Sequence, residues 1–303
     1  MLMTQLARDL SSEGKDIISM SAGEPDFDTP QNIKNSAIDA INRGETKYTA
    51  VDGIDELKQA VIDKFEKDNN LSYEKKNISV APGGKSIIYN AILSTINPGD
   101  EVIIPAPFWV SYPDIVKLAG GNPVIIKTSS ENNFKISANQ LEKSITDKTK
   151  WLFINSPSNP TGQVYSKSEL IEIIKVLKKY KNVYVLSDDI YEYIRYKDHD
   201  KFYTVAELDE EIFSRTITMN GVSKAYSMTG WRIGYCGGPE EIINAMRKLM
   251  GQSTSNPSSI SQWATVEALN GSKDFLQNWI PSFKKRRNYI VDYLNNCDGI
   301  ESV

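Results

Sequence analysis

Apolar residues recur at helical spacing in three segments of the chain, so each segment is predicted to bury one face of a helix. The apolar stripes are Ile33, Ala37 and Ile41; Leu57, Val61 and Phe65; and Leu170, Ile173, Ile174 and Leu177. Gly44 follows the first stripe, where glycine readily takes the left-handed conformation that ends a helix. Ser166 and Glu169 precede the third stripe at the spacing of a capping box, which predicts a helix start there.

Seven short runs between and after these segments are apolar without strict alternation. They cover residues 78–81, 100–106, 122–128, 150–155, 182–187, 215–219 and 232–236. Continuous apolar character is typical of strands that are buried on both faces, as in open sheets flanked by helices. The sequence therefore predicts an α/β fold with a mostly parallel sheet in a large domain.

The strand-like runs end before residue 258, and helix-like sequence takes over from there. A chain of 303 residues exceeds the usual span of one compact domain, so a smaller second domain is expected beside the large one. We expect residues 31–257 to form the large domain. Residues 258–303 are expected to hold a connecting helix and the start of a smaller, incomplete α/β domain.

Composition narrows the possible partners. The net charge of −4, with 40% hydrophobic and 24% charged residues, gives no electrostatic reason to expect nucleic acid or a membrane surface. The N-terminus lacks the apolar centre of a signal peptide, and no apolar run is long enough to span a membrane. Cys236 and Cys297 form no C-x-x-C pair, which fits a reducing compartment, and a cytoplasmic location is expected.

The presence of a single histidine limits which catalytic and metal-binding sites the chain can form. His199 is the single histidine and lies in the polar run "YKDHDK", where a solvated loop residue is expected. Nothing around it resembles the pocket of a Ser-His-Asp or Cys-His mechanism. Metal sites built from several histidines and cysteines are excluded by the same shortage, so no metal is expected.

The stretch "NISVAPGGKSIIYNAI", residues 77–92, has the form of a strand, a glycine turn and a helix. Gly84, Lys85 and Ser86 match the end of a P-loop, but Ser79 stands where the motif has its first glycine. Asp188, after an apolar run, resembles the end of a Walker B strand, so a P-loop-like nucleotide binder stays a remote alternative. More generally, backbone N–H groups at a helix N-terminus bind any phosphate, while a plain glycine turn is the simplest alternative.

A second stretch, "NGVSKAYSMTGWRIGYCGGP", residues 220–239, combines Ser223, Lys224 and Arg232 after a predicted strand. Most lysines are solvated surface charges. Lys224, however, is followed by small, aromatic and apolar residues with no acid nearby in the sequence. Such an environment lowers the pKa of an amine and favours its reaction with an aldehyde.

At these residues the sequence resembles the class I/II aminotransferases that depend on pyridoxal 5′-phosphate (PLP), of fold type I, and especially their aspartate aminotransferase-like branch. Four motifs carry the resemblance, in order: "SAGEPDFDTP", "NSPSNPTG", "SDDIYEYI" and "SKAYSMTGWRIGY". The resemblance implies that residues 31–257 are the PLP-binding domain and that residues 1–30 belong partly to the smaller domain.

The resemblance also implies a partner for each group of PLP. Lys224 would be the catalytic residue and join the cofactor aldehyde, and Asp188 would pair with the ring nitrogen. Asn159 and Tyr191 would hydrogen-bond the phenolic oxygen. Trp109 would stack on the ring, although a core tryptophan is an equally good interpretation of the sequence.

The phosphate of PLP has its own implied partners. Arg232 would bind it bidentately, and Gly83, Gly84 and Lys85 would offer backbone N–H groups. Ser223 would add a hydroxyl. Tyr48 matches a family tyrosine that reaches the phosphate site of the neighbouring subunit, which implies a homodimer with shared active sites.

For the substrates, the resemblance implies an amino acid and a 2-oxo acid, with aspartate and 2-oxoglutarate the leading pair, in ping-pong chemistry. Gly23, Trp109 and Asn159 would line the substrate site. Members of the family extend further at both ends, and their arginine for the substrate α-carboxylate lies in a C-terminal segment beyond this sequence. Another PLP reaction on the same fold, such as that of a C–S lyase, and an inactive PLP-binding homologue remain alternatives.

Overall fold

The computed structural model describes residues 2–20, 23–196 and 201–302, so His199 lies outside the described residues. The helices of this part are α1 Leu2–Ser12, α2 Gln31–Asn42, α3 Asp55–Asn69, α4 Gly84–Leu93, α5 Ser111–Leu118, α6 Ala138–Ser144, α7 Lys167–Leu177, α8 Glu210–Phe213, α9 Glu240–Gly251, α10 Ser259–Asn270 and α11 Leu276–Asn295. The strands are β1 Ile78–Ala81, β2 Glu101–Ala106, β3 Asn122–Lys127, β4 Thr149–Asn155, β5 Tyr184–Asp188, β6 Thr216–Gly221 and β7 Gly234–Gly237.

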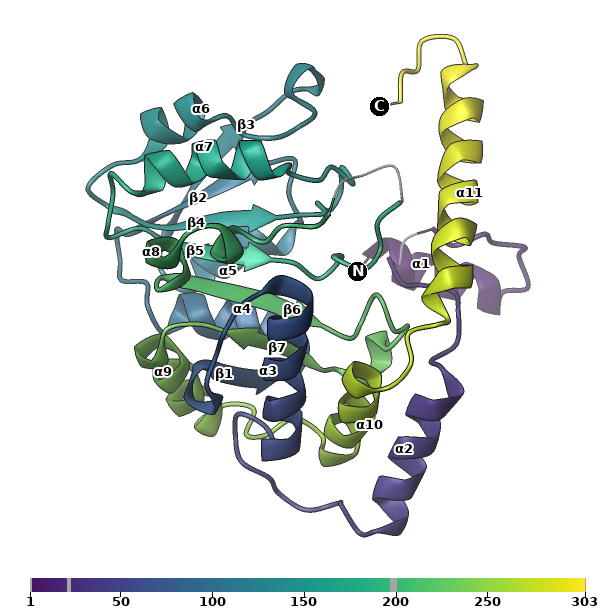
Figure 1. The fold of residues 1–303 in the computed structure, drawn as a ribbon. Helices are drawn as coiled ribbons and strands as arrows, with labels where there is room; N and C mark the ends of the chain where they lie inside the picture. The colour runs from purple at the N-terminus through teal and green to yellow at the C-terminus, as the bar shows by residue number, and fades with distance from the viewer. Residues whose placement is uncertain (1, 21–22, 197–200, 303) are drawn as a thin grey trace.

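All seven strands form one sheet in the order β1-β7-β6-β5-β4-β2-β3 (Figure 1). Strands β6, β5, β4, β2 and β3 run parallel, and β7 lies antiparallel between β1 and β6. The prediction of a mostly parallel sheet flanked by helices is confirmed. Each predicted run overlaps a strand, although the last run begins two residues too early, because β7 starts at Gly234.

The prediction that the strands are buried on both faces is confirmed for the central strand β4 but was wrong for β3. Within β4, Trp151 and Phe153 pack in one hydrophobic cluster, while Leu152 and Ile154 pack in another on the opposite face. Strand β3 is the last in the sheet, and its Ile125 is 40% exposed. Val124 and Ile126 pack in a core cluster on one face of β3, whereas Ile125, on the other face, belongs to none of the core clusters, and the apolar sequence does not reveal this difference.

The stripes predicted for α3 and α7 are buried, and the Ser166–Glu169 capping box is present. Gly44 has a φ of +81° directly after α2, as expected of a helix stop. The stripe predicted for α2 was wrong at one position, because Ile41 is 51% exposed while Ala40 is fully buried. Helix α2 packs mainly against α10, so only the face that meets α10 is covered.

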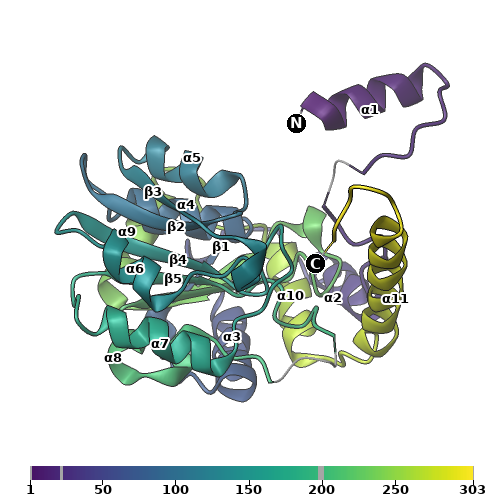
Figure 2. The same cartoon turned by 90° about the horizontal axis from the view of Figure 1, so that it is seen from above.

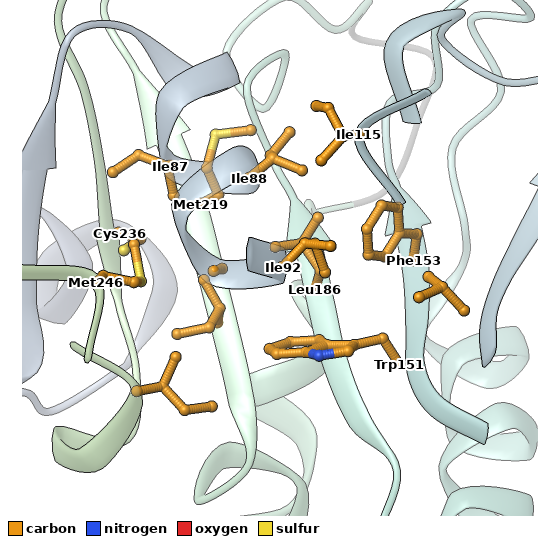
Figure 3. Packing of buried hydrophobic residues seen from close by; sticks show 14 of the residues in the cluster. Ile87, Ile88, Ile92, Ile115, Trp151, Phe153, Leu186, Met219, Cys236 and Met246 are labelled. Carbon is orange, nitrogen blue, oxygen red and sulfur yellow. The ribbon is translucent and has the colours of Figure 1, made fainter. Parts of the chain in front are cut away.

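One face of the sheet is covered by α4, α5 and α9. Ile88 and Ile92 of α4 are completely buried against side chains such as Trp151, Phe153 and Leu186 (Figure 3). Burying one such aliphatic side chain stabilises the fold by about 1.5–3 kcal/mol. This packing holds α4 across the strands, with its N-terminus at the edge where the parallel strands end.

The C-terminal part of the described chain divides into two kinds of helix. Helix α10 packs against α2 and α3, and its Ala264, Ala268 and Leu269 are buried in a core cluster. Helix α11 has no buried residue and stands along one side of the molecule (Figure 1). Because α10 shares the core of the sheet domain, we propose that the smaller domain begins after α10 rather than at residue 258.

Few contacts connect α11 to the rest. Phe27 stacks on Trp279 with ring centroids 4.7 Å apart, and Arg286 pairs with Asp26 at 2.7 Å. Helix α1 stands apart from the sheet and its helices (Figure 2). Within the described part of the chain, no helix combines the length and the apolar character needed to cross a membrane.

The two isoleucines of α2 offer a test of these positions. Ile33, 1% exposed, should lose about 2–5 kcal/mol of unfolding free energy on change to alanine, because a cavity remains. The same change at the half-exposed Ile41 should cost no more than about 1 kcal/mol. Urea denaturation of both variants measures this, and an equal loss at the two sites would contradict the described position of Ile41.

Candidate active site

A cavity of about 430 Å³ opens at the carboxyl ends of the parallel strands. This is the edge at which open α/β sheets place their ligands. Asn155 and Asp188, the last residues of β4 and β5, reach it directly. The lining residues are Gly23, Glu24, Gly84, Lys85, Ile88, Trp109, Tyr112, Asn155, Asn159, Asp188, Ile190, Tyr191, Met219, Ser223, Lys224, Thr229 and Arg232.

The predicted site residues meet at this cavity, although they are spread over more than 200 positions of sequence. All of them line it except Gly83 and Tyr48. Gly83 is the chain neighbour of the lining residue Gly84, and the Arg232 guanidinium occupies the space where a side chain of Gly83 would lie. Tyr48 lies outside the cavity and is 91% exposed, so it does not contribute to the site of its own chain.

Lys224 is half-buried, and its Nζ donates a hydrogen bond to the Gly23 carbonyl oxygen. Burial lowers the pKa of this amine, as the sequence predicted. No acid is close to Lys224 along the chain, but Glu24 is close to it in the folded structure. The Glu24 charge opposes the lowering of the Lys224 pKa, while the Arg232 charge adds to it. Glu24 is held by the Thr229 hydroxyl at 2.8 Å. It is 200 positions away in sequence, which is why local sequence did not reveal it.

Asp188 is almost completely buried at the end of β5. Its carboxylate accepts a hydrogen bond from the Tyr112 hydroxyl at 2.6 Å and one from the Ile190 N–H at 3.3 Å. Burial raises the pKa of Asp188 to about 6, and these two hydrogen bonds hold it from rising further. Near neutral pH this site presents a buried carboxylate, which suits a cationic partner.

Tyr112 is a site residue that the sequence analysis missed. It lies in the first turn of α5, three positions after Trp109, and its ring meets Trp109 edge-on at 5.5 Å. A tyrosine in an apolar helix looks like any core residue. Its hydroxyl becomes significant only because α5 packs beside the end of β5.

Asn155 connects the two loops that hold Asn159 and Tyr191. Its side chain donates to the Asp188 carbonyl at 2.9 Å and accepts from the Asn159 N–H at 2.7 Å. Burial and the Asp188 charge raise the pKa of Tyr191, while a hydrogen bond with Asn159 lowers it. The two predicted partners of the phenolic oxygen are therefore in contact.

The opposite end of the cavity has the features of an anion site. Gly83 precedes α4 with a φ of +89°, and Arg232 is itself left-handed, with a φ of 57°. A side chain on Gly83 would collide with the Arg232 guanidinium, and one on Gly234 would collide with the backbone of Gly83 and Gly84. Glycines are needed here so that the guanidinium and the N-terminus of α4 can approach each other.

These groups fit PLP. The buried Asp188 carboxyl suits a protonated ring nitrogen, the Lys224 amine suits an aldehyde, and Asn159 with Tyr191 suits a phenolic oxygen. Arg232 and the first turn of α4 suit a phosphate. Trp109 is half-buried against the cavity rather than in the core, which favours the stacking role over that of a core tryptophan.

The raised pKa of Asp188 predicts the pH dependence of stability in the cofactor-free protein. Between about pH 4 and pH 6 Asp188 keeps in the folded state a proton that it has lost in the unfolded state, so its contribution to stability falls as pH rises through this window and levels off above it. We expect Asp188→Asn to remove a decline on the order of 2 kcal/mol. Melting curves of both proteins at pH 5 and 7.5 measure this, and an unchanged decline in the variant would refute the assignment.

Comparison with known proteins identifies the family of this chain. The family described as aminotransferase class I and II matches residues 15–303. An aspartate/prephenate aminotransferase of Cereibacter sphaeroides is 53% identical over 98% of this chain and 74% of its own length. An aspartate aminotransferase of Rhizobium meliloti is 51% identical over 96% of this chain and 71% of its own.

Solved structures of aspartate aminotransferases are also similar to this chain. The crystal structure of the aspartate aminotransferase from Rhizobium meliloti, 50% identical, superposes with a TM-score of 0.95 over 99% of this chain and 74% of that one. The aspartate aminotransferase from Thermus thermophilus with maleate, 39% identical, gives 0.93 over 97% and 76%. By sequence and by fold, this chain belongs to the aminotransferase class I and II family.

Proposed function

We propose that this protein transfers the amino group of aspartate, or a related donor, to a 2-oxo acid such as 2-oxoglutarate, with PLP held in the described cavity. The observation that carries the proposal is the convergence of Lys224, Asp188 and Arg232 on one cavity at the carboxyl edge of the sheet. When bound, PLP supplies an electron-withdrawing ring that stabilises negative charge at the substrate Cα.

Lys224 has two roles in this proposal. It holds the cofactor covalently until the amine of the substrate takes its place, and the freed amine then moves the α-proton, as base and as acid in turn. Its lowered pKa keeps more of the amine neutral near pH 7, which favours both roles. The Gly23 carbonyl, which accepts a hydrogen bond from Nζ, fixes where the amine lies.

The remaining residues hold and tune the cofactor. Asp188, kept in place by Tyr112, would preserve the proton on the ring nitrogen. Asn159 and Tyr191 would bind the phenolic oxygen, and Trp109 would cover one face of the ring. Arg232, Ser223 and the N–H groups at the start of α4 would bind the phosphate.

One cation at the cavity supports a dicarboxylic donor. With Lys224 assigned to the aldehyde and Arg232 to the phosphate, Lys85 is the remaining cation of the lining residues. Its Nζ lies 4.9 Å from the centre of the Trp109 ring, so it stands beside the proposed substrate site. We propose that Lys85 binds the side-chain carboxylate of the donor, in addition to offering its backbone N–H to the phosphate.

A homodimer completes the proposal. Tyr48 is a large side chain that is 91% exposed, and family resemblance assigns it to the phosphate site of a second copy. A cytoplasmic location is also proposed, since neither cysteine is in a disulfide.

The first test is the covalent link. Purified protein loaded with PLP should be yellow, and borohydride should bleach the colour and fix the cofactor on Lys224. Lys224→Ala should lose on the order of 10⁴-fold or more in kcat, because the nucleophile and the proton carrier are lost together. Lys175→Ala, at an exposed lysine, is the control; a Lys224→Ala variant with parental turnover would overturn the proposal.

The second test concerns the substrate. Lys85→Met should raise the KM for aspartate roughly ten-fold, about 1.4 kcal/mol, while a neutral aromatic donor is nearly unaffected. The neutral donor serves as the internal control for phosphate binding, since both donors need the cofactor equally. Equal losses for the two donors would assign Lys85 to the cofactor alone.

Product analysis separates the proposal from the other reactions of the fold. Transamination yields a 2-oxo acid and a new amino acid in ping-pong kinetics, whereas a lyase would release ammonia and pyruvate. An inactive homologue would bind PLP and give neither set of products.

A further inference from the structure

A buried polar network lies behind the cavity, on the side away from the proposed cofactor. Lys64 of α3 forms an ion pair with Glu192, and their side chains are only 1% and 3% exposed. Asn69, the last residue of α3, accepts a hydrogen bond from Lys64 at 2.5 Å and donates one to Glu192 at 2.8 Å. The three side chains form a closed triangle, and none of them lines the cavity.

Tyr193 strengthens the same connection. Two ammonium groups lie near its ring, with Lys64 Nζ 5.5 Å and Lys273 Nζ 5.3 Å from the ring centre. Its hydroxyl donates to Asp68, which also lies 3.8 Å from Lys273. The segment after β5 is therefore fixed to the C-terminal turns of α3 by two separate sets of charged contacts.

This segment holds site residues and network residues side by side. Asp188 and Tyr191 line the cavity, whereas Glu192 and Tyr193 face α3. The turn between them is tight, with the Glu192 N–H bonded to the Asp189 carbonyl at 3.0 Å and the Ile194 N–H bonded to the Tyr191 carbonyl at 2.8 Å. A shift of Glu192 would therefore move Tyr191, its covalent neighbour.

Stability alone is a weak reason for this network. Removing two charges from water costs several kcal/mol per ion, and apolar side chains of similar volume are often as stable or more stable. What a buried ion pair with hydrogen-bonded partners does provide is a fixed geometry. The network lies next to the two residues whose position matters most for the cofactor ring.

We propose that Lys64, Glu192 and Asn69 are positioning residues, which hold the 188–193 segment so that Tyr191 and Asp188 meet the cofactor in one geometry. This inference rests on the proposed function, because it assumes that Tyr191 donates to the phenolic oxygen of PLP. Donation to that oxygen stabilises its anionic form and lowers the pKa of the coloured cofactor–lysine group. Loosening Tyr191 should therefore raise that pKa and weaken cofactor binding.

The decisive variant replaces the whole network by apolar side chains of similar size: Lys64→Met, Asn69→Leu and Glu192→Met together. It leaves no buried polar atom of the triangle without a partner, so the fold should be retained. We expect the pKa of the visible absorbance to rise by roughly half a unit or more, and PLP to dissociate on the order of ten-fold faster. Both are spectroscopic readouts that do not require turnover.

Arg215→Met is the matched control for lost stability. Arg215 is a buried cation at the opposite end of the sheet, bonded to the backbone carbonyls of Leu177 and Val183. Loss of the Arg215 charge should lower the melting temperature without changing the pKa of the visible absorbance. A triple variant that titrates and releases PLP like the parent would overturn the inference.

If the triple variant does not fold, Asn69→Ala decides, because it removes both hydrogen bonds of the Asn69 amide and leaves the Lys64–Glu192 ion pair in place. A rise in the pKa of the visible absorbance, smaller than that expected for the triple variant, supports the inference, and no rise overturns it. Parent protein that forms no coloured group on Lys224 would instead refute the proposed function itself, so the two failures are distinguishable.

Discussion

The site depends on a carboxyl group that is buried at the end of a central strand. Asp188 would be solvated at no cost on a surface loop, but at the end of β5 its burial raises its pKa to about 6. The Tyr112 hydroxyl, which donates at 2.6 Å, offsets part of that cost. A buried anion of this kind gains most from a cation that fits the cavity, and a protonated pyridine ring is such a cation. The charge chemistry of the protein thus favours its proposed cofactor before any other contact is considered.

The second constraint is close approach of backbone to backbone. Strand β7 brings Gly234 against Gly83 and Gly84, and Arg232 lies over Gly83. Because side chains at these glycines would collide with their neighbours, the start of α4 and the Arg232 guanidinium can face one anion together. A left-handed backbone at Arg232, which costs on the order of 1–2 kcal/mol, is tolerated at the same place. The anion end of the cavity therefore depends on the antiparallel insertion of β7 into an otherwise parallel neighbourhood.

These two ends are joined by the segments that follow β4 and β5. Asn155 links the two loops on the cavity side, and the Lys64–Glu192 pair fixes the second loop from behind. The proposed chemistry needs Lys224, Tyr191 and Asp188 to keep their relative positions while substrates exchange. A loop held from both sides meets that need better than one held by the cavity alone.

The sequence by itself determined the strands, the buried stripes of α3 and α7, and ten of the seventeen residues that line the cavity, because these follow from local apolar patterns and from the short motifs that carry the family resemblance. It failed at Ile41 and at Ile125 of β3, where exposure depends on which element covers that face. It also missed Tyr112 as a partner of Asp188 and Glu24 as a charge near Lys224. Only the tertiary structure decided these points, because hydrogen bonds and charges act through distance in space, and residues 76 or 200 positions apart carry no local sign that they will meet.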